Sequence, residues 1–378
     1  MYILIIANGY PSEKHKLAGI FEFDQAKALA KAKQKVVFAA IDMRSIRHKR
    51  HWGFESFERD GVQIEAVNIP CGRIPKKILN IVGIIALKFL YKKIVEKYGT
   101  PDVIHAHFIE MGYFTVKVFE KIKVPLVLTE HFSGINKTKL SKDLLKLGSF
   151  TYRRFDQVIT VSNALAKNIK DNFGVKTITI PNIVDTECFG YKANKQDNGF
   201  SFVSVGSLVF NKGMDLLIQA FAKSFKGKKE VKLYIYGEGP EKYRLQKMID
   251  EFGLKEQVIL LGLAERKEIA QKMSESDCFV LASRGETFGV AYVEAMAMGL
   301  PVIATKCGGP EDFVTTQNGI LIPKDNINSL ADALTMMHNN ISVYDRKKIS
   351  DYARKRFGPD TIAEQLKNVY INLIESKR

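Results

Sequence analysis

Two glutamates eight residues apart are the most informative chemical feature of this sequence. Glu286 follows a short apolar run that ends at Ala282 and a Ser-Arg-Gly turn, and Glu294 lies eight positions further on. If a helix begins close to Phe288, Glu286 stands at its entrance and Glu294 lies two turns along a related face. Because an ionised carboxylate accepts hydrogen bonds from two donors at once, this pair would suit vicinal hydroxyls, such as those of a sugar ring and a ribose.

A structural role is the alternative for both glutamates. Glu286 would then complement the helix dipole, and Glu294 would be a solvated surface residue. The segment around Glu294, VAYVEAMAM, leaves little polar face on a helix, which argues against a surface position. We therefore favour ligand binding, most clearly for Glu294.

A second candidate is the loop between the strand-like run FVSVG (202–206) and a helical segment that begins near Gly213. Gly206 at the strand end lets the backbone approach a ligand, helix N-terminal amides attract phosphate, and Lys212 adds a positive charge. These features fit a diphosphate cradle, but taken alone they favour the alternative, an ordinary turn with a solvated lysine. The spacing does not match the phosphate loop of nucleoside triphosphatases.

Three histidines lie in or directly after predicted buried strands. His105 lies inside its strand, where a core histidine with satisfied hydrogen bonds is the favoured interpretation. His107 and His131 follow strand carboxyl ends, where parallel sheets form clefts, and both are candidates to line an acceptor site. Neither their spacing nor that of the four scattered cysteines matches a metal site, so no fixed metal is predicted.

These candidates are positioned by alternating strands and helices. Short β-rich apolar runs alternate with segments of helical spacing before and after a polar stretch at residues 191–199. A chain of 378 residues is long enough for two cores. We therefore predict an α/β protein with two Rossmann-like, doubly wound parallel-sheet domains facing a cleft. The predicted strands are 2–7, 36–41, 102–106, 125–129, 157–161, 177–181, 202–206, 231–237, 257–262, 278–282 and 301–305, and the clearest helices are 21–33, 76–97 and 163–173.

Most of the positive charge lies in the first half of the chain. Residues 1–190 contain 30 Lys and Arg against 18 Asp and Glu, within a total net charge of +16. Such an excess attracts nucleic acid, anionic lipid or an anionic substrate, and charge alone does not choose among them. The basic stretch 44–51 and the Lys-flanked apolar stretch 76–93 fit contact with an anionic membrane, whereas a solvated face and a core helix would explain them equally well.

Targeting signals are weak. The apolar run Ile78–Leu90 is shorter than the ~20 residues that a membrane helix needs. The N-terminal residues lack a basic start and a small-residue cleavage site, so we expect a cytoplasmic protein, with contact at the inner face of the membrane as an extension of that expectation.

Several motifs, in this order, resemble the retaining glycosyltransferases of family 4, which have the two-domain GT-B fold. The E-x7-E spacing followed by EAMAMGLPVIATKCGGPEDFV carries the resemblance, which extends over nearly the whole chain. Other segments similar to family motifs are DVIHAHF (102–108), PNIVDTECF (181–189), GSLVFNKG (206–213), YGEGPE (236–241) and RFGPDTIAEQLKNVYINLI (356–374).

The resemblance implies an acceptor domain at 1–185, a linker at 186–200, a nucleotide-sugar domain at 201–358 and a helix at 359–378 that returns to the first domain. It implies transfer of a hexose-type sugar, with retention, from a nucleotide-diphosphate sugar to a hydroxyl of a glycan or lipid-linked acceptor in cell-surface polysaccharide or glycolipid assembly. A UDP-sugar is favoured over a GDP- or ADP-sugar, and no metal or further cofactor is expected. No nucleic-acid partner is expected, and the oligomeric state is left open.

The resemblance also implies residue roles. Lys212 would hold the donor diphosphate, Glu286 the hydroxyls of the transferred sugar and Glu294 those of the ribose, while His107 would lie beside the reacting centre. Ser207 stands where the family usually has an arginine, and Arg284 is a candidate substitute. The implied donor-binding set also includes Gly19, Gly206, Ser207, Gly237, Arg284, Thr287, Phe288, Gly289, Val290 and His131.

Two other classes of function remain open at this point. A nicotinamide-dependent oxidoreductase would share the doubly wound domains, although no G-x-G-x-x-G follows either first strand. A non-catalytic module that binds polyanions would explain the charge. Within the sugar enzymes, a phosphorylase or an epimerase is a further alternative.

Overall fold

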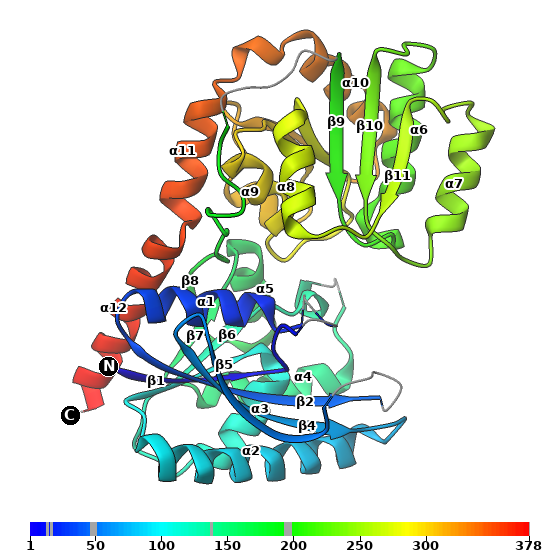
Figure 1. Ribbon diagram of the computed structural model, residues 1–378. Coiled ribbons are helices and arrows are strands. Elements are labelled where there is room, and N and C mark those ends of the chain that lie inside the picture. The colour runs from blue at the N-terminus through cyan, green and yellow to red at the C-terminus, as the bar shows by residue number, and fades with distance from the viewer. Residues whose placement is uncertain (13–14, 16–17, 46–50, 137–138, 193–198, 378) are drawn as a thin grey trace. The chain divides into compact units, whose positions relative to one another are not determined.

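The structure is a computed structural model that describes residues 1–12, 15, 18–45, 51–136, 139–192 and 199–377 (Figure 1). Its internal contacts divide the chain into two compact units. Unit 1 comprises Met1–Ile183 with Pro359–Arg378, and unit 2 comprises Val184–Gly358. Parts of two predicted segments, 193–198 of the linker and 46–50 of the basic stretch, lie outside the described residues.

In the described part of unit 1, eight strands form one sheet in the order β3-β4-β2-β1-β5-β6-β7-β8. All neighbours pair in parallel except β3 and β4. Every residue of β1, β5 and β6 is buried, as expected for strands covered on both faces. The bounds are β1 (Tyr2–Ala7), β2 (Lys35–Arg44), β3 (Gly53–Arg59), β4 (Val62–Pro70), β5 (Val103–His107), β6 (Leu126–Glu130), β7 (Gln157–Thr160) and β8 (Ile178–Thr179).

Helices cover both faces of this sheet (Figure 1). Helix α1 packs with α12 on one face, and α2 packs with α3 on the other. Helix α5 begins at a capping Ser162, whose Oγ accepts a hydrogen bond from Leu165 N, and ends at the left-handed Gly174, as predicted. The bounds are α1 (Ile20–Lys31), α2 (Lys76–Tyr98), α3 (Phe108–Phe119), α4 (Lys142–Thr151), α5 (Asn163–Phe173) and α12 (Pro359–Lys377), with short 3-10 turns η1 (Ser133–Asn136) and η2 (Tyr152–Arg154).

The β3–β4 hairpin is absent from the sequence prediction and makes the edge of the sheet antiparallel. Its turn is Asp60-Gly61, and both residues have positive φ, 52° and 76°. A two-residue Asp-Gly turn of this kind matches the twist of antiparallel strands. The purely parallel sheet predicted for the first domain therefore needs this correction at one edge.

Helix α12 completes the core of unit 1, although it follows unit 2 in the sequence. Its residues Ile362, Ala363, Leu366 and Tyr370 are buried in one cluster with apolar side chains of β1, β2 and α1. The last segment of the chain is therefore part of the first core.

In unit 2, six parallel strands among the described residues form a sheet in the order β11-β10-β9-β12-β13-β14. The strands are β9 (Phe200–Val205), β10 (Val231–Tyr236), β11 (Val258–Gly262), β12 (Cys278–Leu281), β13 (Val302–Thr305) and β14 (Gly319–Ile322). The helices are α6 (Met214–Phe225), α7 (Lys242–Glu251), α8 (Arg266–Glu275), α9 (Val290–Ala297), α10 (Ile327–Asn339) and α11 (Arg346–Phe357), and the 3-10 turns are η3 (Phe210–Lys212), η4 (Gly309–Asp312) and η5 (Ile341–Val343).

The predicted fold class, two doubly wound α/β domains, is confirmed. Two details of unit 2 differ from the prediction. Strand β14 was not expected, and α9 begins at Val290 rather than close to Phe288. Gly289 has φ 95°, a left-handed conformation that a right-handed helix cannot include, so the helix begins after it.

Among the described residues, no helix has both the length and the apolar character to cross a bilayer.

Candidate active site

Three loops meet in direct backbone contact after strands β9, β10 and β12 of unit 2. A Cβ atom on Gly213 would lie 1.9 Å from the carbonyl oxygen of Ala282, and one on Gly237 would lie 1.9 Å from that of Gly206. No side chain fits at either position, so glycine is required for the loops to approach this closely. The loops carry most of the predicted donor-binding residues, and the fold brings them together at one edge of the sheet.

Lys212 and Glu286 face each other across these loops. Lys212 Nζ lies 2.6 Å from Glu286 Oε1, which also accepts a hydrogen bond of 2.6 Å from Ser283 Oγ. Glu286 is only 8% exposed. Its backbone is also fixed, since its N–H donates to the carbonyl of Cys307 and its carbonyl accepts from Gly309 N. Lys212, predicted to hold the diphosphate, and Glu286, predicted to hold the sugar, are therefore in direct contact.

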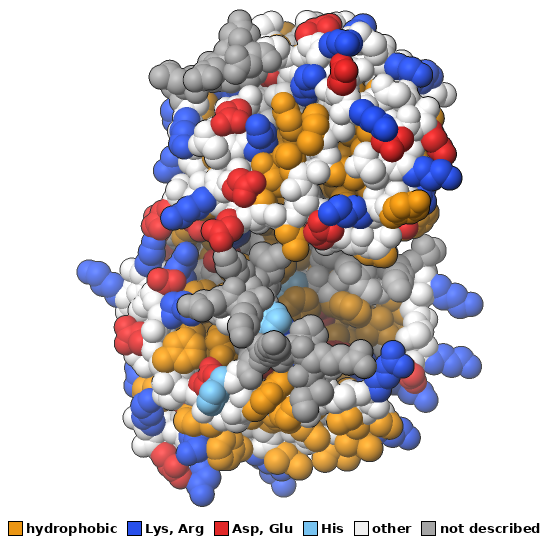
Figure 2. All heavy atoms as spheres, turned by 45° about the vertical axis from the view of Figure 1, so that its right-hand side comes forward, with side chains coloured by type: hydrophobic (Ala, Val, Ile, Leu, Met, Phe, Trp, Pro, Cys, Tyr) orange, Lys and Arg blue, Asp and Glu red, His pale blue; other side chains and the backbone are white. Residues whose placement is uncertain are grey.

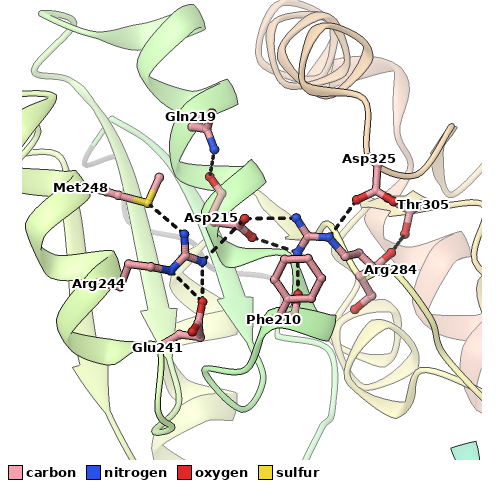
Figure 3. Close-up of polar contacts among 10 residues, drawn as sticks. Phe210, Asp215, Gln219, Glu241, Arg244, Met248, Arg284, Thr305 and Asp325 are labelled. Carbon is pink, nitrogen blue, oxygen red and sulfur yellow. Dashed lines mark hydrogen bonds and ion pairs between the residues drawn. The ribbon is translucent and has the colours of Figure 1, made fainter. Parts of the chain in front are cut away.

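Arg284 does not present a free guanidinium beside Lys212 and Glu286. Its two terminal nitrogens donate to the two carboxylate oxygens of Asp215 at 3.0 Å each, and Nε donates to Asp325 at 2.8 Å (Figure 3). It also donates to the carbonyl of Phe210 and lies over the Phe210 ring at 3.8 Å. The guanidinium thus joins the loop after β12 to the loop after β9, an arrangement that argues against its predicted role as a substitute cation.

The loops are joined by backbone contacts as well. Arg284 N donates to the carbonyl of Asn211 at 2.8 Å, and Asn211 Nδ2 donates to that of Gly285 at 2.8 Å. Burial alone would raise the pKa of Asp215, but the hydrogen bonds and charge of Arg284, together with the charge of Arg244, outweigh burial and hold this pKa below its usual value. Asp215 is therefore ionised at neutral pH, and the clamp formed by Asp215 and Arg284 is charged.

Glu294 lies in the second half of α9 and is 8% exposed. Its Oε1 accepts a hydrogen bond of 3.0 Å from Arg266 of α8, and Arg266 also lies 3.9 Å from Asp185. The predicted solvated alternative is excluded by this burial. The carboxylate is held by a neighbouring cation.

The residues between the two glutamates differ in what they expose. Phe288 is buried and packs against Phe313 and Phe357, so only its backbone can reach a ligand. Thr287, Gly289 and Val290 are half-buried. The first amides of a helix lack intrahelical partners, and those of α9 therefore form a potential phosphate contact after Gly289.

Ser207 is exposed directly after Gly206. Burial therefore does not restrict the size of a side chain at this position.

Three histidines of unit 1, His105, His107 and His131, form a buried row. His105 is bonded on both ring nitrogens, to Tyr370 Oη and to Thr129 Oγ1 at 2.7 Å each, so the interpretation of His105 as a core residue agrees with the structure. His107 Nδ1 lies 3.1 Å from His131 Nε2. The other ring nitrogens, His107 Nε2 and His131 Nδ1, are buried and make no hydrogen bond of standard length with any described residue.

Burial keeps these histidines neutral. It lowers the pKa of His105 and of His131 to about 3 and that of His107 well below its usual value, and the neighbouring histidines act in the same direction on His105 and His107. The side chain of Asn182 opposes the shift at His131 without outweighing burial. At neutral pH the row can accept or donate hydrogen bonds but carries no charge.

A cavity of about 400 Å³ opens in unit 1 beside this row. Glu22, Phe108 and Lys76 line it, as does Gly19, whose Cβ would lie 2.5 Å from the carbonyl of Gly9. Its apolar wall consists of Ile20, Phe21, Phe108, Ile109, Met111, Phe132, Leu144 and Leu147. His107 and His131 are not in the lining, whereas the residues that follow them, Phe108 and Phe132, are.

Two lining residues carry unusual features that the sequence did not reveal. Phe108 has φ 65°, a left-handed conformation that costs a bulky residue roughly 1–3 kcal/mol. Burial raises the pKa of Glu22 to about 7, so this carboxyl titrates near neutral pH inside an apolar cavity. Glu22 is a candidate that sequence reasoning missed, because its position in the predicted helix gave no sign of a cavity.

No group of three or more His, Cys, Asp or Glu side chains that could hold a metal is present among the described residues.

Both halves of the chain match glycosyltransferase families. Residues 190–356 match the family described as glycosyl transferases group 1, and residues 22–188 match glycosyltransferase family 4. The chain is a family 4, group 1 glycosyltransferase. The predicted resemblance is thereby confirmed, and this membership replaces the two alternatives from other functional classes.

Relatives of this glycosyltransferase vary in length. An uncharacterized glycosyltransferase of Methanocaldococcus jannaschii is 29% identical over 330 residues, which cover 85% of this chain and 88% of the relative. The GPI3 subunit of the phosphatidylinositol N-acetylglucosaminyltransferase of Saccharomyces cerevisiae is 27% identical over 60% of this chain. That match spans only 53% of the subunit.

Solved structures share the fold of this glycosyltransferase over its whole length. Sucrose-phosphate synthase from Thermosynechococcus elongatus has a TM-score of 0.83 at 20% identity, with full coverage of both chains. The Anabaena protein HepE in complex with UDP has a TM-score of 0.76 at 21% identity, covering 98% of this chain and 99% of HepE. The predicted GT-B fold is confirmed.

Proposed function

We propose that this glycosyltransferase moves a hexose-type sugar from a nucleotide-diphosphate sugar to a hydroxyl acceptor, with retention at the transferred carbon. The observation that carries the proposal is the convergence of Lys212 and Glu286 at 2.6 Å on loops held together by backbone contacts. A donor sugar diphosphate bears both groups that this pair would recognise, a negative diphosphate for the lysine and sugar hydroxyls for the carboxylate.

The Lys212–Glu286 ion pair supplies both groups that such a donor would need. When a donor binds, the diphosphate would take Lys212 as its counter-ion, and the Glu286 carboxylate would turn its accepting oxygens to hydroxyl groups. Ser283 keeps Glu286 oriented through its hydrogen bond of 2.6 Å. Glu294, held by Arg266, would receive the ribose hydroxyls, and the amides after Gly289 would face the phosphates.

In the proposed reaction the acceptor oxygen forms a bond to the anomeric carbon while the bond from that carbon to the diphosphate oxygen breaks. The acceptor proton passes to the leaving diphosphate on the same face, which gives retention without a protein nucleophile. The chain would then contribute positioning and charge stabilisation, and Lys212 would stabilise the departing diphosphate.

The acceptor proposal rests on the cavity of unit 1. Its wall is largely apolar, and the Glu22 carboxyl is the buried titratable group in its lining. A lipid-linked or otherwise apolar-flanked acceptor would fill the wall and place a hydroxyl against Glu22. We extend the proposal to a UDP-sugar donor, which is supported by the fold shared with the UDP-bound HepE, and to work on cell-surface polysaccharide or glycolipid at the cytoplasmic side of a membrane.

The test combines a donor screen with two variants. Nucleotide sugars carrying UDP, GDP or ADP are compared for thermal stabilisation of the full chain, since a ligand at 100 times its dissociation constant adds ~2.7 kcal/mol. Lys212→Ala and Glu286→Ala should each lower transfer by roughly 10²–10³-fold, the usual cost of removing one group that stabilises developing charge.

The matched control is another Lys–Glu pair of unit 2, Lys229 and Glu256, which lie 3.0 Å apart on the surface. Lys229→Ala and Glu256→Ala should leave transfer unchanged. Full activity of Lys212→Ala and Glu286→Ala with folded protein would refute the proposed site.

A further inference from the structure

Helix α2 exposes a stripe of apolar side chains along one face. Ile78, Ile81, Ile85 and Phe89 are 47%, 57%, 61% and 45% exposed, and their spacing of three to four residues places them on one side of the helix. Phe54 of β3 extends the stripe, since its ring packs edge-on against Phe89 with centroids 6.1 Å apart. Figure 2 shows hydrophobic side chains gathered along the edge of unit 1 where Figure 1 places α2.

Lysines border this stripe. Lys77 and Lys88 lie on one side of it, Lys92 at its C-terminal end and Lys93 on the other side, and all four are exposed. Lys93 Nζ lies 5.0 Å and 5.2 Å from the ring centres of Phe54 and Phe89. The helix contains six lysines and a single acidic residue, Glu96.

The opposite face fixes α2 to the domain. Gly83, Ala86, Leu87, Leu90 and Ile94 are buried. A Cβ on Gly83 would lie 2.4 Å from the Phe114 ring, so glycine allows α2 to lie directly against α3. The stripe therefore sits on a helix with its own packed core face, and the exposed apolar residues do not serve that core.

We propose that this face of α2 docks on an anionic lipid bilayer, with the isoleucines and Phe89 entering the boundary between headgroups and acyl chains. A helix with an apolar stripe bordered by lysines is suited to lie in that interface, because apolar burial and attraction to anionic headgroups then act together. The +12 balance of residues 1–190 adds a long-range attraction of the same sign.

The acidic groups near this face do not reverse its charge. Glu96 lies 3.9 Å from Lys92, and Glu110 of α3 lies 3.0 Å from Lys76, so each has a cation beside it. A lysine remains on each border of the stripe, in Lys88 and Lys93.

The docking surface also bears on the acceptor, a link that rests on the proposed function. Lys76 at the start of α2 lines the unit 1 cavity, and Ile78 of the stripe follows it by two residues. A bilayer held by the stripe would therefore reach the neighbourhood of the cavity, where a lipid-linked acceptor could enter without leaving the membrane.

The experiment measures sedimentation of the full chain with vesicles of phosphatidylcholine alone and of phosphatidylcholine with phosphatidylglycerol. Ile81→Ser, Ile85→Ser and Phe89→Ser are combined in one variant, and Lys88→Gln, Lys92→Gln and Lys93→Gln in another. We expect binding to the anionic vesicles, a loss of roughly 100-fold in the apolar variant, and a loss of roughly fivefold per lysine at low salt in the other.

Matched controls carry the same changes elsewhere in the chain. One replaces three exposed apolar residues of unit 2, Leu263, Met336 and Val343, by serine, and the other replaces Lys228, Lys229 and Lys247 by glutamine. Both should bind the anionic vesicles as the parent chain does. Because the control for the lysines has the same net charge as the lysine variant, it separates a local surface from overall charge.

Two results would overturn the inference. One is no binding of the parent chain to anionic vesicles, whether or not the chain self-associates through α2, and the other is equal losses in the α2 variants and their controls. Donor-dependent transfer to a water-soluble acceptor should be unchanged in the α2 variants. If the α2 variants lose vesicle binding and keep transfer, the result supports the docking surface. Transfer by Lys212→Ala bears only on the proposed function, so the two proposals can fail separately.

Discussion

Replacing Asp215 with alanine should distinguish two roles for Arg284. If Arg284 is a clamp that joins the loops after β9 and β12, removing its carboxylate partner should weaken both the fold of unit 2 and donor binding. If Arg284 instead serves as the missing diphosphate cation, Asp215→Ala would free the guanidinium and leave donor affinity equal or higher.

The magnitude follows from the burial of the pair. The Asp215 and Arg284 side chains are 11% and 13% exposed, and two hydrogen bonds of 3.0 Å join them. Removing one partner of a buried pair costs about 3–5 kcal/mol. Because Asp325 and the Phe210 carbonyl still accept hydrogen bonds from Arg284, we expect a loss at the low end of this range, about 3 kcal/mol. For a unit of this size, that loss corresponds to a fall in Tm of roughly 6–12 °C.

The assay is thermal unfolding of Asp215→Ala, Arg284→Ala and the double variant, each with and without a donor nucleotide. The double variant should be less unstable than the sum of the single ones, with a coupling energy of about 1–3 kcal/mol. Glu241→Ala is the control, because it removes a carboxylate from Arg244 in the same network at a half-exposed position and should cost less than about 1 kcal/mol. For a unit of this size, 1 kcal/mol corresponds to ~2–4 °C in Tm. The clamp would be refuted if the Tm of Asp215→Ala fell by less than about 2 °C, or if this variant bound the donor more tightly.

Three further changes test other parts of the chain. Ser207→Arg should lower the apparent donor constant by roughly tenfold, about 1.4 kcal/mol, since it places a cation at an exposed position beside Gly206; an unchanged constant in a donor titration would contradict this. Glu22 has a pKa of about 7 in the folded chain against 4.5 in the unfolded chain, so the folded form binds more protons and the parent chain loses stability as pH rises through this window. In urea unfolding, the free energy of unfolding of Glu22→Gln should therefore rise by about 3 kcal/mol relative to that of the parent chain between pH 4.5 and pH 8. A difference between the two chains that does not change with pH would oppose the assignment. Tyr370→Phe leaves His105 Nδ1 without its partner and should cost about 1–3 kcal/mol in the same measurement, whereas no loss would mean that the bond adds nothing to stability.

Much of the fold could be predicted because its signals are local. Buried parallel strands read as continuous apolar runs, and the cap of α5 at Ser162 and Gly174 could be read directly. The hairpin β3–β4 was missed because β3 alternates between exposed and half-buried residues and has no apolar run, although its Asp60-Gly61 turn was a usable signal.

The candidate site was predictable in its residue types but not in its pairings. Lys212 and Glu286 are 74 positions apart, and nothing local in the sequence indicates that they form an ion pair. Asp215, the partner of Arg284, likewise lies in a different segment, on the first turn of α6, so the sequence did not indicate this ion pair either. The Glu22 cavity depends on side chains from several separate segments, so it could not be read from any one of them.

The place of α12 has a consequence for how the protein is made. Its buried residues, Ile362 through Tyr370, belong to the core of unit 1, yet the ribosome produces them only after all of unit 2. During synthesis unit 2 can complete its own core first, while β1 and α1 await the helix that covers them. The apolar surface of the nascent unit 1 is thus exposed for as long as it takes to translate about 175 residues, roughly 10–35 s at 5–20 residues per second, and this interval is when it would most need a chaperone.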